Sequence, residues 1–527
     1  MSAWQQHLVI VPIVLPLALG SLMLLLNERH VLIKGIASLV ALLALVGVSI
    51  ALLDKADDSM TQVYRLGAWP APFGIVLVAD RLAALMVLLA SILGLAALTF
   101  SLARWDRAGP RFHSLFQFLL MGVNGAFLTG DLFNLFVFFE VFLAASYGLA
   151  LHGSGTARVR ASLHYIAINL TASLLFLIGA ALLYGITGTL NMADLAARVP
   201  LIAEEDRVLL EAGAAVLGIA FLVKAGMWPL CFWLPGAYSA ASAPAAAVFA
   251  ILTKVGVYSV LRMWLLLFGG DGPSAGFGGE WLVIGGLATL AFGAVGVLAS
   301  HELSRLASFS LLASSGTLLA AIGAGEAAVT GAALYYLIAS TLGVSAFFLL
   351  IELVERGRTP GADVLAVTAE AFDLEDEVEL QEEQIGVAIP ATMALLGVSF
   401  ACCALVLAGL PPFAAFVGKL ALLHALLAPA SIPVNVWVLL VLLIVSGFAA
   451  VISVGRAGVQ IFWGTEKRSV PRVRVIEMAP IVLLLAISAV LTVQAGPVMR
   501  YLDDTAQGLH APRGYIDAVL EREGARR

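Results

Sequence analysis

The sequence has few charged residues for its length. Of its 527 residues, 12% are charged and 61% are hydrophobic, and the mean hydropathy is +1.00. A soluble globular protein has roughly 25% charged residues, so this composition excludes that class. The apolar runs are long and continuous, whereas outer-membrane barrels show short segments that alternate in polarity. The composition therefore predicts an all-α polytopic membrane protein.

Residues that would form a cofactor or nucleotide site are also scarce. The cysteines Cys231, Cys402 and Cys403 lie in or beside apolar segments, which supports neither a disulfide framework nor a zinc site. There is no Walker-type phosphate-binding loop, no dinucleotide fingerprint, and no paired haem or iron–sulfur ligands. The net charge of -6 is small and most acids fall in one loop, so a nucleic-acid partner is not indicated. We expect no cofactor, and energy that comes from an ion gradient or from partner subunits.

The apolar runs predict fourteen transmembrane helices, because a spanning helix needs about 20 mostly apolar residues. The run 386–428 is counted as one discontinuous span. The predicted spans are 8–26, 32–53, 76–103, 112–130, 131–150, 162–186, 208–227, 240–268, 281–300, 305–325, 327–353, 386–428, 434–458 and 476–499. No cationic segment precedes the first run, so we expect no cleavable signal peptide.

We treat residues 1–527 as a single transmembrane domain with both termini on the periplasmic side. In that orientation the inner connections hold fourteen Lys and Arg residues and the outer connections hold four, although the C-terminal tail adds five more outside. Segments 112–268 and 281–456 contain five spans each. An odd number of spans inverts the second unit relative to the first, so we expect two inverted repeats. The connection 359–385 is strongly acidic; we expect a solvated cytoplasmic loop, with a docking or cation-attracting surface as the alternative.

Ionisable residues lie inside the apolar runs, where inserting a charged side chain into the membrane costs free energy. Only six lysines occur, and three of them, Lys224, Lys254 and Lys419, fall within predicted spans. A lysine at the bilayer centre costs about 2.5–3.5 kcal/mol, and such residues usually face the bundle interior and mark an ion pathway. Glu140 lies among phenylalanines near the middle of the fifth span. We predict that Glu140 pairs with Lys224; an ion pair that only orders the bundle is the alternative.

Prolines break two of these charged segments. The seventh span reads FLVKAGMWPLCFWLPG, and the twelfth reads LAGLPPFAAFVGKL. Proline removes a backbone donor, and freed carbonyls at membrane depth are tolerated only where protein or water satisfies them. A broken helix beside an ionisable group in each half is typical of an ion pathway. Lys254 follows Pro244 by ten residues, which places it about 15 Å along its helix, near mid-membrane.

Several serine and threonine side chains lie in the sequence between Lys254 and Lys419. For any one of them, a hydrogen bond to a neighbouring helix is favoured over a role in carrying water and protons. Asp131 and Glu352 are expected at the membrane interface, and Arg262 and Arg456 are expected to extend to the surface from span ends. The polar residues of this region are His301, Glu302, Arg305, Ser308, Ser310, Ser314, Ser315, Thr317, Ser340, Thr341 and Ser345.

Three segments together resemble a known family. TGDLFNLFVFFEVFLAASYGL, FLVKAGMWPLCFWLPGAYSAASAPAAAVFAILTKVGVYSV and GLPPFAAFVGKL are similar to the proton-translocating antiporter-like subunits of respiratory complex I. DLFNLFVFFEVF and the N-terminal HLVIVPIVLPL resemble more closely the D subunit of the multisubunit Mrp-type sodium/proton antiporter. The resemblance covers about residues 8–500. It implies fourteen spans, two inverted five-helix repeats, discontinuous helices 7 and 12, and a central hydrophilic axis.

The resemblance also implies roles for the buried charges. Glu140 matches the fifth-span glutamate, Lys224 the seventh-span lysine, Lys254 the eighth-span relay residue, and Lys419 the twelfth-span terminal lysine. The segment YYLIASTLGVSAFFLL departs from some complex I relatives, which carry His and Lys there. A relay through this segment would depend on water and hydroxyl groups.

The sequence therefore predicts a subunit of a hetero-oligomeric Mrp-type antiporter in a bacterial inner membrane. It would exchange cytoplasmic Na+ for external H+, with Li+ or K+ as further candidate cations. Its partners would be other antiporter subunits and membrane lipids, and we expect no enzyme activity in this chain. Two alternatives stay open: a proton-pumping membrane-arm subunit of a complex I-like redox enzyme, and a scaffold for an ion site made by another subunit.

Overall fold

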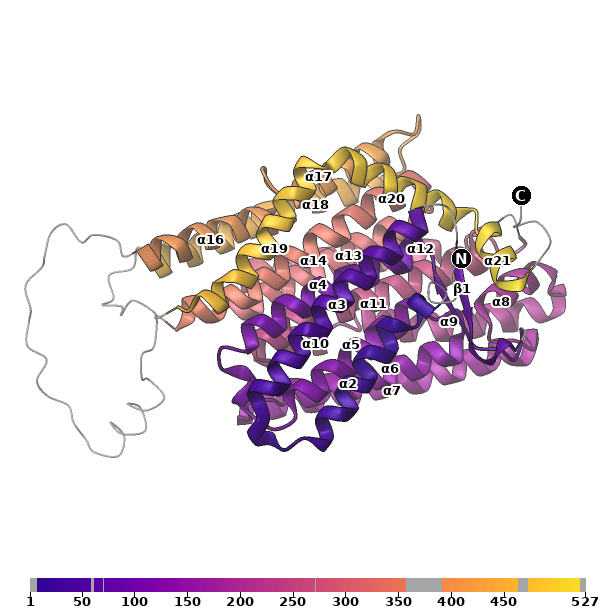
Figure 1. The fold of residues 1–527 in the computed structure, drawn as a ribbon. Coiled ribbons are helices and arrows are strands. Elements are labelled where there is room, and N and C mark those ends of the chain that lie inside the picture. The colour runs from indigo at the N-terminus through magenta and orange to yellow at the C-terminus, as the bar shows by residue number, and fades with distance from the viewer. Residues whose placement is uncertain are drawn as a thin grey trace, which may run out of the picture.

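The computed structural model describes residues 7–57, 61–69, 71–270, 272–356, 391–462 and 473–521. In these ranges the chain is almost entirely helical, and the long helices run side by side in one elongated bundle (Figure 1). Twelve of the described helices are long and apolar enough to cross a membrane, and three shorter apolar helices accompany them. The prediction of an all-α polytopic protein is confirmed, whereas the number of fourteen spans stays a prediction. The acidic connection 359–385 lies outside the described residues.

The helices of the bundle occur along the chain in the following order. The N-terminal ones are α2 (Val11–Leu25), α3 (Val31–Asp57) and α4 (Arg81–Ser101). Next come α5 (Phe112–Leu128), α6 (Leu132–Ala150), α7 (Thr156–Thr187), α8 (Met192–Arg198), α9 (Glu204–Ala225), α10 (Trp233–Ala240) and α11 (Ala243–Phe268). The second half holds α12 (Gly279–Ala299), α13 (Leu303–Gly323), α14 (Ala327–Glu355), α16 (Ala391–Ala408), α17 (Ala414–Leu427) and α18 (Val434–Phe462). The chain ends with α19 (Val475–Val493), α20 (Ala495–His510) and α21 (Arg513–Leu520).

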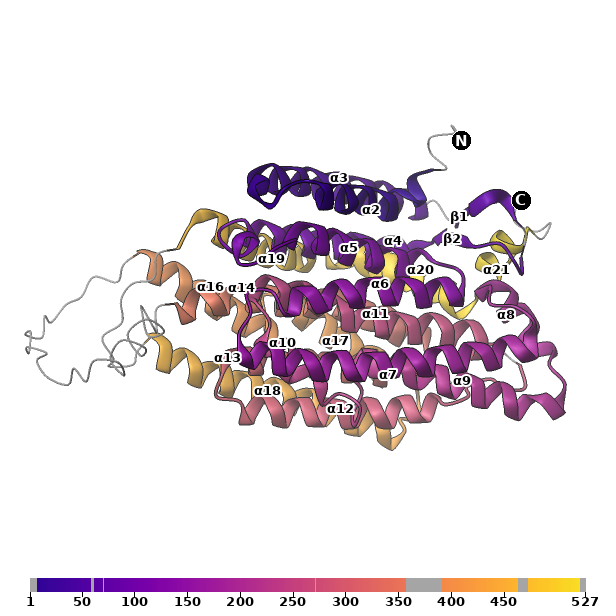
Figure 2. The same cartoon turned by 90° about the horizontal axis from the view of Figure 1, so that it is seen from below.

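Two helices, α11 and α14, form the centre of the bundle. Nearly every residue of both is buried, as expected for helices that are apolar on all sides. Figure 2 shows the α2–α3 hairpin on one side of this centre and α12 with α18 on the other. The outer helices α3 and α18 expose many large apolar side chains, as a lipid-facing surface requires. Lys254, near the middle of α11 and 0% exposed, is therefore remote from the surface of the bundle.

The two predicted helix breaks are present, and they have the same geometry. α9 ends before Gly226 and α16 ends before Gly409, and these glycines have positive φ angles of 76° and 73°. In each case the residue after the glycine donates its N–H to the carbonyl five residues earlier, at 3.0 Å and 2.9 Å. A left-handed glycine with this bond is a common helix ending, and proline often follows it. The breaks therefore arise from a glycine and the prolines together.

A hairpin and two C-terminal helices were not predicted. β1 (Gln62–Arg65) pairs antiparallel with β2 (Val76–Ala79), so the predicted span 76–103 begins as a strand and becomes helical only at α4. Asp80 sets that boundary, because its side chain caps α4 by accepting from the N–H of Ala83 at 2.9 Å. Arg65 donates to the carbonyls of Ala518 and Val519 in α21. The hairpin and α21 thus lie together at one end of the bundle (Figure 1).

Candidate functional site

Glu140 is carried by α6, whose first turn is fixed by the loop before α8. Asp131 caps α6 by accepting from the N–H of Asn134 at 2.8 Å. Its backbone also bridges to Asn191, whose side chain caps α8. Asp131 is only 7% exposed. Its carboxylate thus serves as a helix cap inside the protein, and the expectation that Asp131 lies at the depth of the membrane interface stays a prediction.

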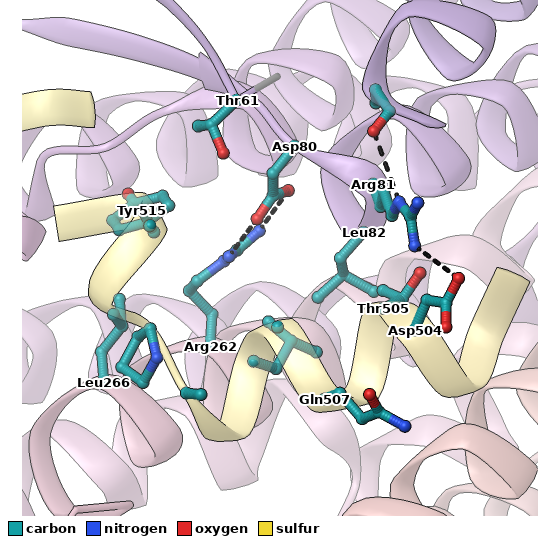
Figure 3. A pocket seen from close by; sticks show the side chains of 16 residues that line it. Thr61, Asp80, Arg81, Leu82, Arg262, Leu266, Asp504, Thr505, Gln507 and Tyr515 are labelled. Carbon is teal, nitrogen blue, oxygen red and sulfur yellow. Dashed lines mark hydrogen bonds and ion pairs between the residues drawn. The ribbon is translucent and has the colours of Figure 1, made fainter. Parts of the chain in front are cut away.

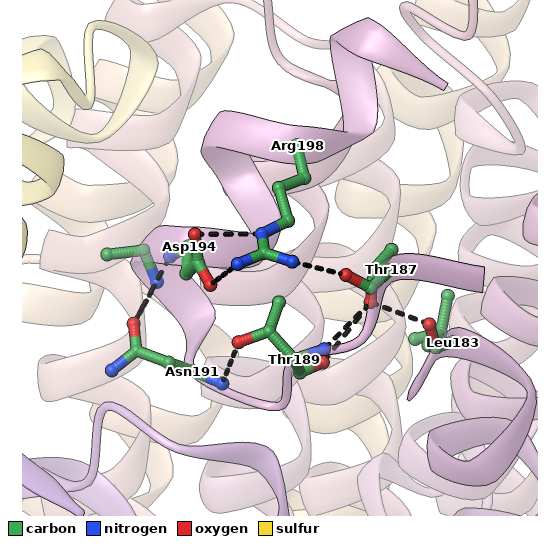
Figure 4. A network of polar contacts seen from close by, with 7 residues as sticks. Leu183, Thr187, Thr189, Asn191, Asp194 and Arg198 are labelled. Carbon is green, nitrogen blue, oxygen red and sulfur yellow. Dashed lines mark hydrogen bonds and ion pairs between the residues drawn. The ribbon is translucent and has the colours of Figure 1, made fainter. Parts of the chain in front are cut away.

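A polar network holds the loop against which α6 begins (Figure 4). Arg198 donates to the carboxylate of Asp194 at 3.0 Å and to the carbonyl oxygen of Thr187 at 2.7 Å. The hydroxyl of Thr187 donates to the carbonyl of Leu183 at 2.7 Å. The end of α7 and the short helix α8 are thereby tied together, and together they fix the start of the helix that carries Glu140.

Glu140 and Lys224 face the same aromatic region but do not form an ion pair. The carboxylate of Glu140 accepts a hydrogen bond from the hydroxyl of Ser173 on α7. Lys224 lies in the last turn of α9 and is 5% exposed. Its Nζ atom is 5.1 Å from the ring centroid of Phe139, and it has no hydrogen-bond partner among the described residues. The predicted pairing is therefore not seen in this structure: Ser173 holds the carboxylate, and the ammonium lies against an aromatic ring.

Lys254 is fully buried in α11 and is held by hydroxyl groups. Its Nζ atom donates to Ser314 at 3.0 Å and to Ser315 at 3.4 Å, both on α13. Ser314 in turn is hydrogen-bonded to Ser340 of α14 at 2.8 Å. One continuous polar chain therefore links three helices at the centre of the bundle. Most of the other hydroxyls of this region bond the carbonyl four residues earlier in their own helix, namely Ser308, Ser310, Thr317 and Thr341.

The helices that carry Lys224 and Lys254 touch at a glycine. A Cβ atom at Gly256 would lie 2.8 Å from the carbonyl carbon of Lys224, closer than real contacts allow. The backbone of α9 at Lys224 therefore rests on α11 only two residues beyond Lys254. A larger side chain at Gly256 would push the helices apart between the two lysines.

Lys419 occupies the second helix break. It lies in α17, and its Nζ atom donates to the carbonyl oxygen of Ala408, near the end of α16, at 2.9 Å. A cation at a helix C-terminus is favoured by the helix dipole. Gly409 lies against the Lys419 side chain, where a Cβ atom would come within 2.6 Å of it. Beside Lys419 is an apolar groove of about 400 Å³ between α17 and α18.

Tyr336 on α14 is a residue that sequence reasoning missed. Its hydroxyl lies beside Ser314 and Thr317 of α13. On the other side of α14, a Cβ atom at Gly418 would lie 3.1 Å from the Cβ atom of Tyr336. The tyrosine thus lies between the hydroxyls around Lys254 and the helix of Lys419. Tyr336 follows Tyr335 in an apolar run, where tyrosines are typically core residues, and no spacing distinguishes it.

Arg262 differs from its expected role. It is 5% exposed and donates two hydrogen bonds to the carboxylate of Asp80, at 2.5 and 2.7 Å (Figure 3). Its guanidinium also lies over the rings of Tyr258 and Tyr515. The expectation that Arg262 extends to the surface is wrong, because Asp80 supplies a carboxylate inside the protein. The pair lines a cavity of about 430 Å³ beneath the C-terminal helices.

The arrangement brings together basic groups that can take up and release protons across the width of the bundle. Glu140 on α6 and Lys224 on α9 come first, Lys254 with its hydroxyl chain lies at the centre, and Lys419 lies at the second break. Within the part of the chain that the structure describes, no three His, Cys, Asp or Glu side chains gather as metal ligands.

Comparison with known proteins identifies the family. The family model described as NADH:quinone oxidoreductase/Mrp antiporter, transmembrane, matches residues 129–449. The chain belongs to this family. The D subunit of the probable K(+)/H(+) antiporter of Rhizobium meliloti is 55% identical, over 99% of this chain and 98% of its own. The D subunit of the Na(+)/H(+) antiporter of Alkalihalophilus pseudofirmus is 36% identical, over 98% of this chain and 99% of its own.

A solved structure agrees with this assignment. A chain of the Mrp complex from Dietzia sp. DQ12-45-1b matches with a TM-score of 0.82 and 26% identity, over 98% of this chain and 100% of that chain. The resemblance to the Mrp D subunit that the sequence segments indicated is confirmed. So is the prediction of a multi-pass integral membrane protein.

Proposed function

We propose that this chain is a subunit of a monovalent cation/proton antiporter that exchanges cytoplasmic Na+ or K+ for external protons. It would act in a complex with other Mrp-type subunits in a bacterial inner membrane. The names of the relatives support the exchange of a monovalent cation for a proton, and they differ in the cation. The excess of basic residues in the inner connections supports periplasmic termini and a cytoplasmic position for the acidic connection 359–385.

The observation that carries this proposal is a series of three lysines, of which Lys224 and Lys254 are buried and Lys419 is partly exposed. Lys224 and Lys254 lie on helices that touch at Gly256, and a hydroxyl chain runs from Lys254 to α14. α14 packs in turn against α17, the helix of Lys419. Three lysines at membrane depth would be costly unless they served a pathway. Their order across the bundle supports a proton relay that starts at Glu140 and ends at Lys419.

In this relay Glu140 and Lys224 form the switch. When Lys224 takes up a proton, its positive charge attracts the carboxylate of Glu140 and competes with the hydrogen bond from Ser173. When the proton moves on towards Lys254, that attraction ends and the carboxylate returns to Ser173. Each step changes the charge beside the Glu140 carboxylate, which can bond either to Ser173 or to Lys224. The step therefore shifts the population between these two arrangements. Lys254 passes the proton through the hydroxyls, and Lys419 delivers it to the far side or to a neighbouring subunit.

We also propose that 112–268 and 281–456 are inverted repeats of five spans each. The matching glycine endings of α9 and α16 support this relation, because each repeat then contains one broken helix with the same termination. Broken helices in corresponding positions of two inverted repeats are common in ion-coupled transporters. The repeat relation would explain why a lysine lies beside each break.

The exchange can be tested in inverted membrane vesicles from an antiporter-deficient host that expresses the whole operon. The vesicles are energised, and the collapse of the pH gradient is followed after addition of Na+, Li+, K+ or choline chloride. Wild type is compared with Glu140→Ala at equal amounts of complex. We expect Na+- or K+-dependent collapse in wild type and none in the variant, and the more active cation identifies the substrate.

The other outcomes separate the alternatives. An unchanged cation response in Glu140→Ala would place the pathway in another subunit and leave this chain as a scaffold. A wild-type complex without any cation response would instead favour a redox-driven proton pump, which the family description also covers. Redox subunits encoded beside this chain would support that second reading.

A further inference from the structure

A second set of buried polar side chains lies on α5, away from the lysines. His113, Gln117 and Asn124 are spaced by four and seven residues, so they share one face of the helix. Gly122 and Gly125, on another face of α5, lie against Phe138 and Phe142 of α6. The polar face is therefore turned away from the helix that carries Glu140.

This polar face packs on the α2–α3 hairpin. His113 Nδ1 is 3.2 Å from the hydroxyl of Ser38 on α3. Asn124 Nδ2 donates to the carbonyl oxygen of Pro12 on α2 at 3.0 Å. Pro16 cannot donate to that carbonyl, so Asn124 satisfies a group that the proline leaves without its helical partner. We call the interface between α5 and the α2–α3 hairpin the α5 seam.

At the start of α5, the α5 seam holds buried side-chain atoms that have no hydrogen-bond partner among the described residues. We call this end, next to Asp106, the inner end of the seam. Asp106 lies in the short turn η4 (Trp105–Arg107), and its Oδ2 atom is 4.0 Å from His113 Nε2. Asp106, His113 and Gln117 are 8%, 3% and 0% exposed. Among the described residues, Asp106 Oδ1, His113 Nε2 and both polar atoms of Gln117 have no hydrogen-bond partner. The hydroxyl of the neighbouring Ser114, 1% exposed, also has none in the described part of the chain.

Such atoms imply an occupant. A buried polar group without a partner costs roughly 1–3 kcal/mol, and several together in one apolar interface are unusual. The atoms at this end are rich in oxygen acceptors: a carboxylate oxygen, an amide oxygen and a hydroxyl. Hard monovalent cations and their hydration water prefer these oxygen ligands.

We propose that the inner end of the α5 seam binds a hydrated monovalent alkali cation, with the carboxylate of Asp106 and the amide oxygen of Gln117 as ligands. The proposal rests on the proposed exchange function, because it gives the transported cation a binding site apart from the lysine relay. The cation and the proton would thus use different sides of the same chain.

The charges around Asp106 are compatible with a cation. Lys34 of α3 is paired with Glu28 at 2.9 Å, and Glu28 also accepts from the N–H of Arg111 at the start of α5. His152, after α6, is bonded through Nε2 to the carbonyl of Trp105 at 2.7 Å. His113 on α5 faces Asp106 directly. On the turn itself, the positive charge of Arg107 also interacts with Asp106, so a bound cation would share the carboxylate with it.

The test is the accessibility of a cysteine in the α5 seam. Cys231, Cys402 and Cys403 are replaced by alanine in the whole complex, and Ser114→Cys is introduced, which keeps both proposed ligands. Leu119→Cys on the same helix, equally buried, is the matched control. Vesicles are treated with the small cationic thiol reagent MTSEA in choline, Na+ or K+ chloride, and labelling is followed by mass spectrometry.

We expect the Ser114→Cys variant to be labelled at least about tenfold faster than Leu119→Cys in choline, which corresponds to a difference of about 1.4 kcal/mol in activation free energy. Na+ or K+ should slow the labelling several-fold, and Asp106→Asn should abolish that protection. Equal labelling of the two variants would overturn the proposal. Labelling of Ser114→Cys that no cation slows would also overturn it, since the seam would then hold water alone.

A second measurement covers the case in which Ser114→Cys fails to assemble. The melting temperature of the purified complex is measured in choline, Na+ and K+ chloride for wild type and for Asp106→Asn. The site predicts that one alkali cation raises Tm in wild type and that Asp106→Asn removes the increase; equal shifts in both would contradict it. Neither the labelling nor the Tm measurement depends on cation/proton exchange. If the complex shows cation protection but no exchange, the binding site is supported and only the proposed transport function fails.

Discussion

The two helix breaks have nearly the same backbone but hold their lysines differently. At the first break, Lys224 belongs to the helix that ends, and its ammonium group lies against Phe139 without a hydrogen-bond partner among the described residues. At the second break, Lys419 reaches back from the following helix and donates to the carbonyl of Ala408. One lysine is thus fixed by a helix terminus, and the other depends on its surroundings for a partner.

This difference assigns different roles to the two ends of the relay. A charge without a fixed partner in an apolar site is sensitive to any change nearby, so Lys224 is suited to switching. Glu140 supplies the change, because its carboxylate can bond either to Ser173 or to the ammonium group. Lys419 has a permanent acceptor, so it is suited to holding a proton at the exit.

The largest effect is expected from removing the charge that operates the switch. Glu140→Gln keeps the size of the side chain and an acceptor for Ser173, but it cannot attract the protonated Lys224. We expect exchange to fall by about 10²-fold or more, as for the loss of a group essential to proton transfer. Vesicle exchange rates at equal amounts of complex measure this, with Ser173→Ala as the control that keeps the charge. A wild-type rate for Glu140→Gln would show that the charge of Glu140 does not operate a switch at the first break.

The two glycines offer a matched comparison of the breaks themselves. Gly226→Ala and Gly409→Ala both place a Cβ atom at positive φ, which costs about 1–2 kcal/mol. At Gly409 the added carbon also collides with the Lys419 side chain, whereas at Gly226 it meets Leu312 and Leu234. We therefore expect similar losses of Tm but a greater loss of exchange for Gly409→Ala. Equal losses of exchange would mean that the position of Lys419 does not matter.

A smaller effect is expected in the centre of the relay. Ser314→Ala removes one of the two hydroxyls that accept from Lys254 and breaks the link to Ser340. One hydrogen bond contributes about 1 kcal/mol, so exchange should fall about fivefold. Ser308→Ala is the control, because that buried hydroxyl bonds a carbonyl of its own helix. If both variants behave alike, the hydroxyl chain is structural.

The smallest effect on exchange is expected at the pair outside the relay. Asp80→Asn removes the partner of the buried Arg262 and should destabilise the chain by roughly 3–5 kcal/mol. The rate per assembled complex should stay near that of wild type. Thermal unfolding together with vesicle exchange separates the two quantities. A strong loss of exchange with an unchanged Tm would place Arg262 in the pathway.

Local sequence signals predicted the parts of the molecule that depend on local chemistry. Long apolar runs indicated the helices, prolines indicated both breaks, and the rarity of lysine identified Lys224, Lys254 and Lys419. The bonds of these residues could not be predicted in the same way. Which hydroxyl faces Lys254 depends on how α11, α13 and α14 are rotated, and no residue spacing encodes that rotation.

Long-range and uncharged features were missed for similar reasons. Asp80 and Arg262 are 182 residues apart, so nothing near either one indicates the pair. The seam residues His113, Gln117 and Asn124 fall in an apolar run and carry no fixed charge, so a search for buried charges passes over them. Their helical spacing is a usable signal, although the missing partners that give it meaning appear only after folding.

The most direct test of the switch is Lys224→Arg. Arginine keeps the positive charge and can lie against Phe139, but it does not release a proton in the working pH range. The vesicle assay with Na+ and K+ is run on wild type and Lys224→Arg at equal amounts of complex. The account predicts that the variant assembles but shows no cation-dependent collapse of the pH gradient. Collapse at the wild-type rate would contradict it, because Lys224 would then be only a fixed charge.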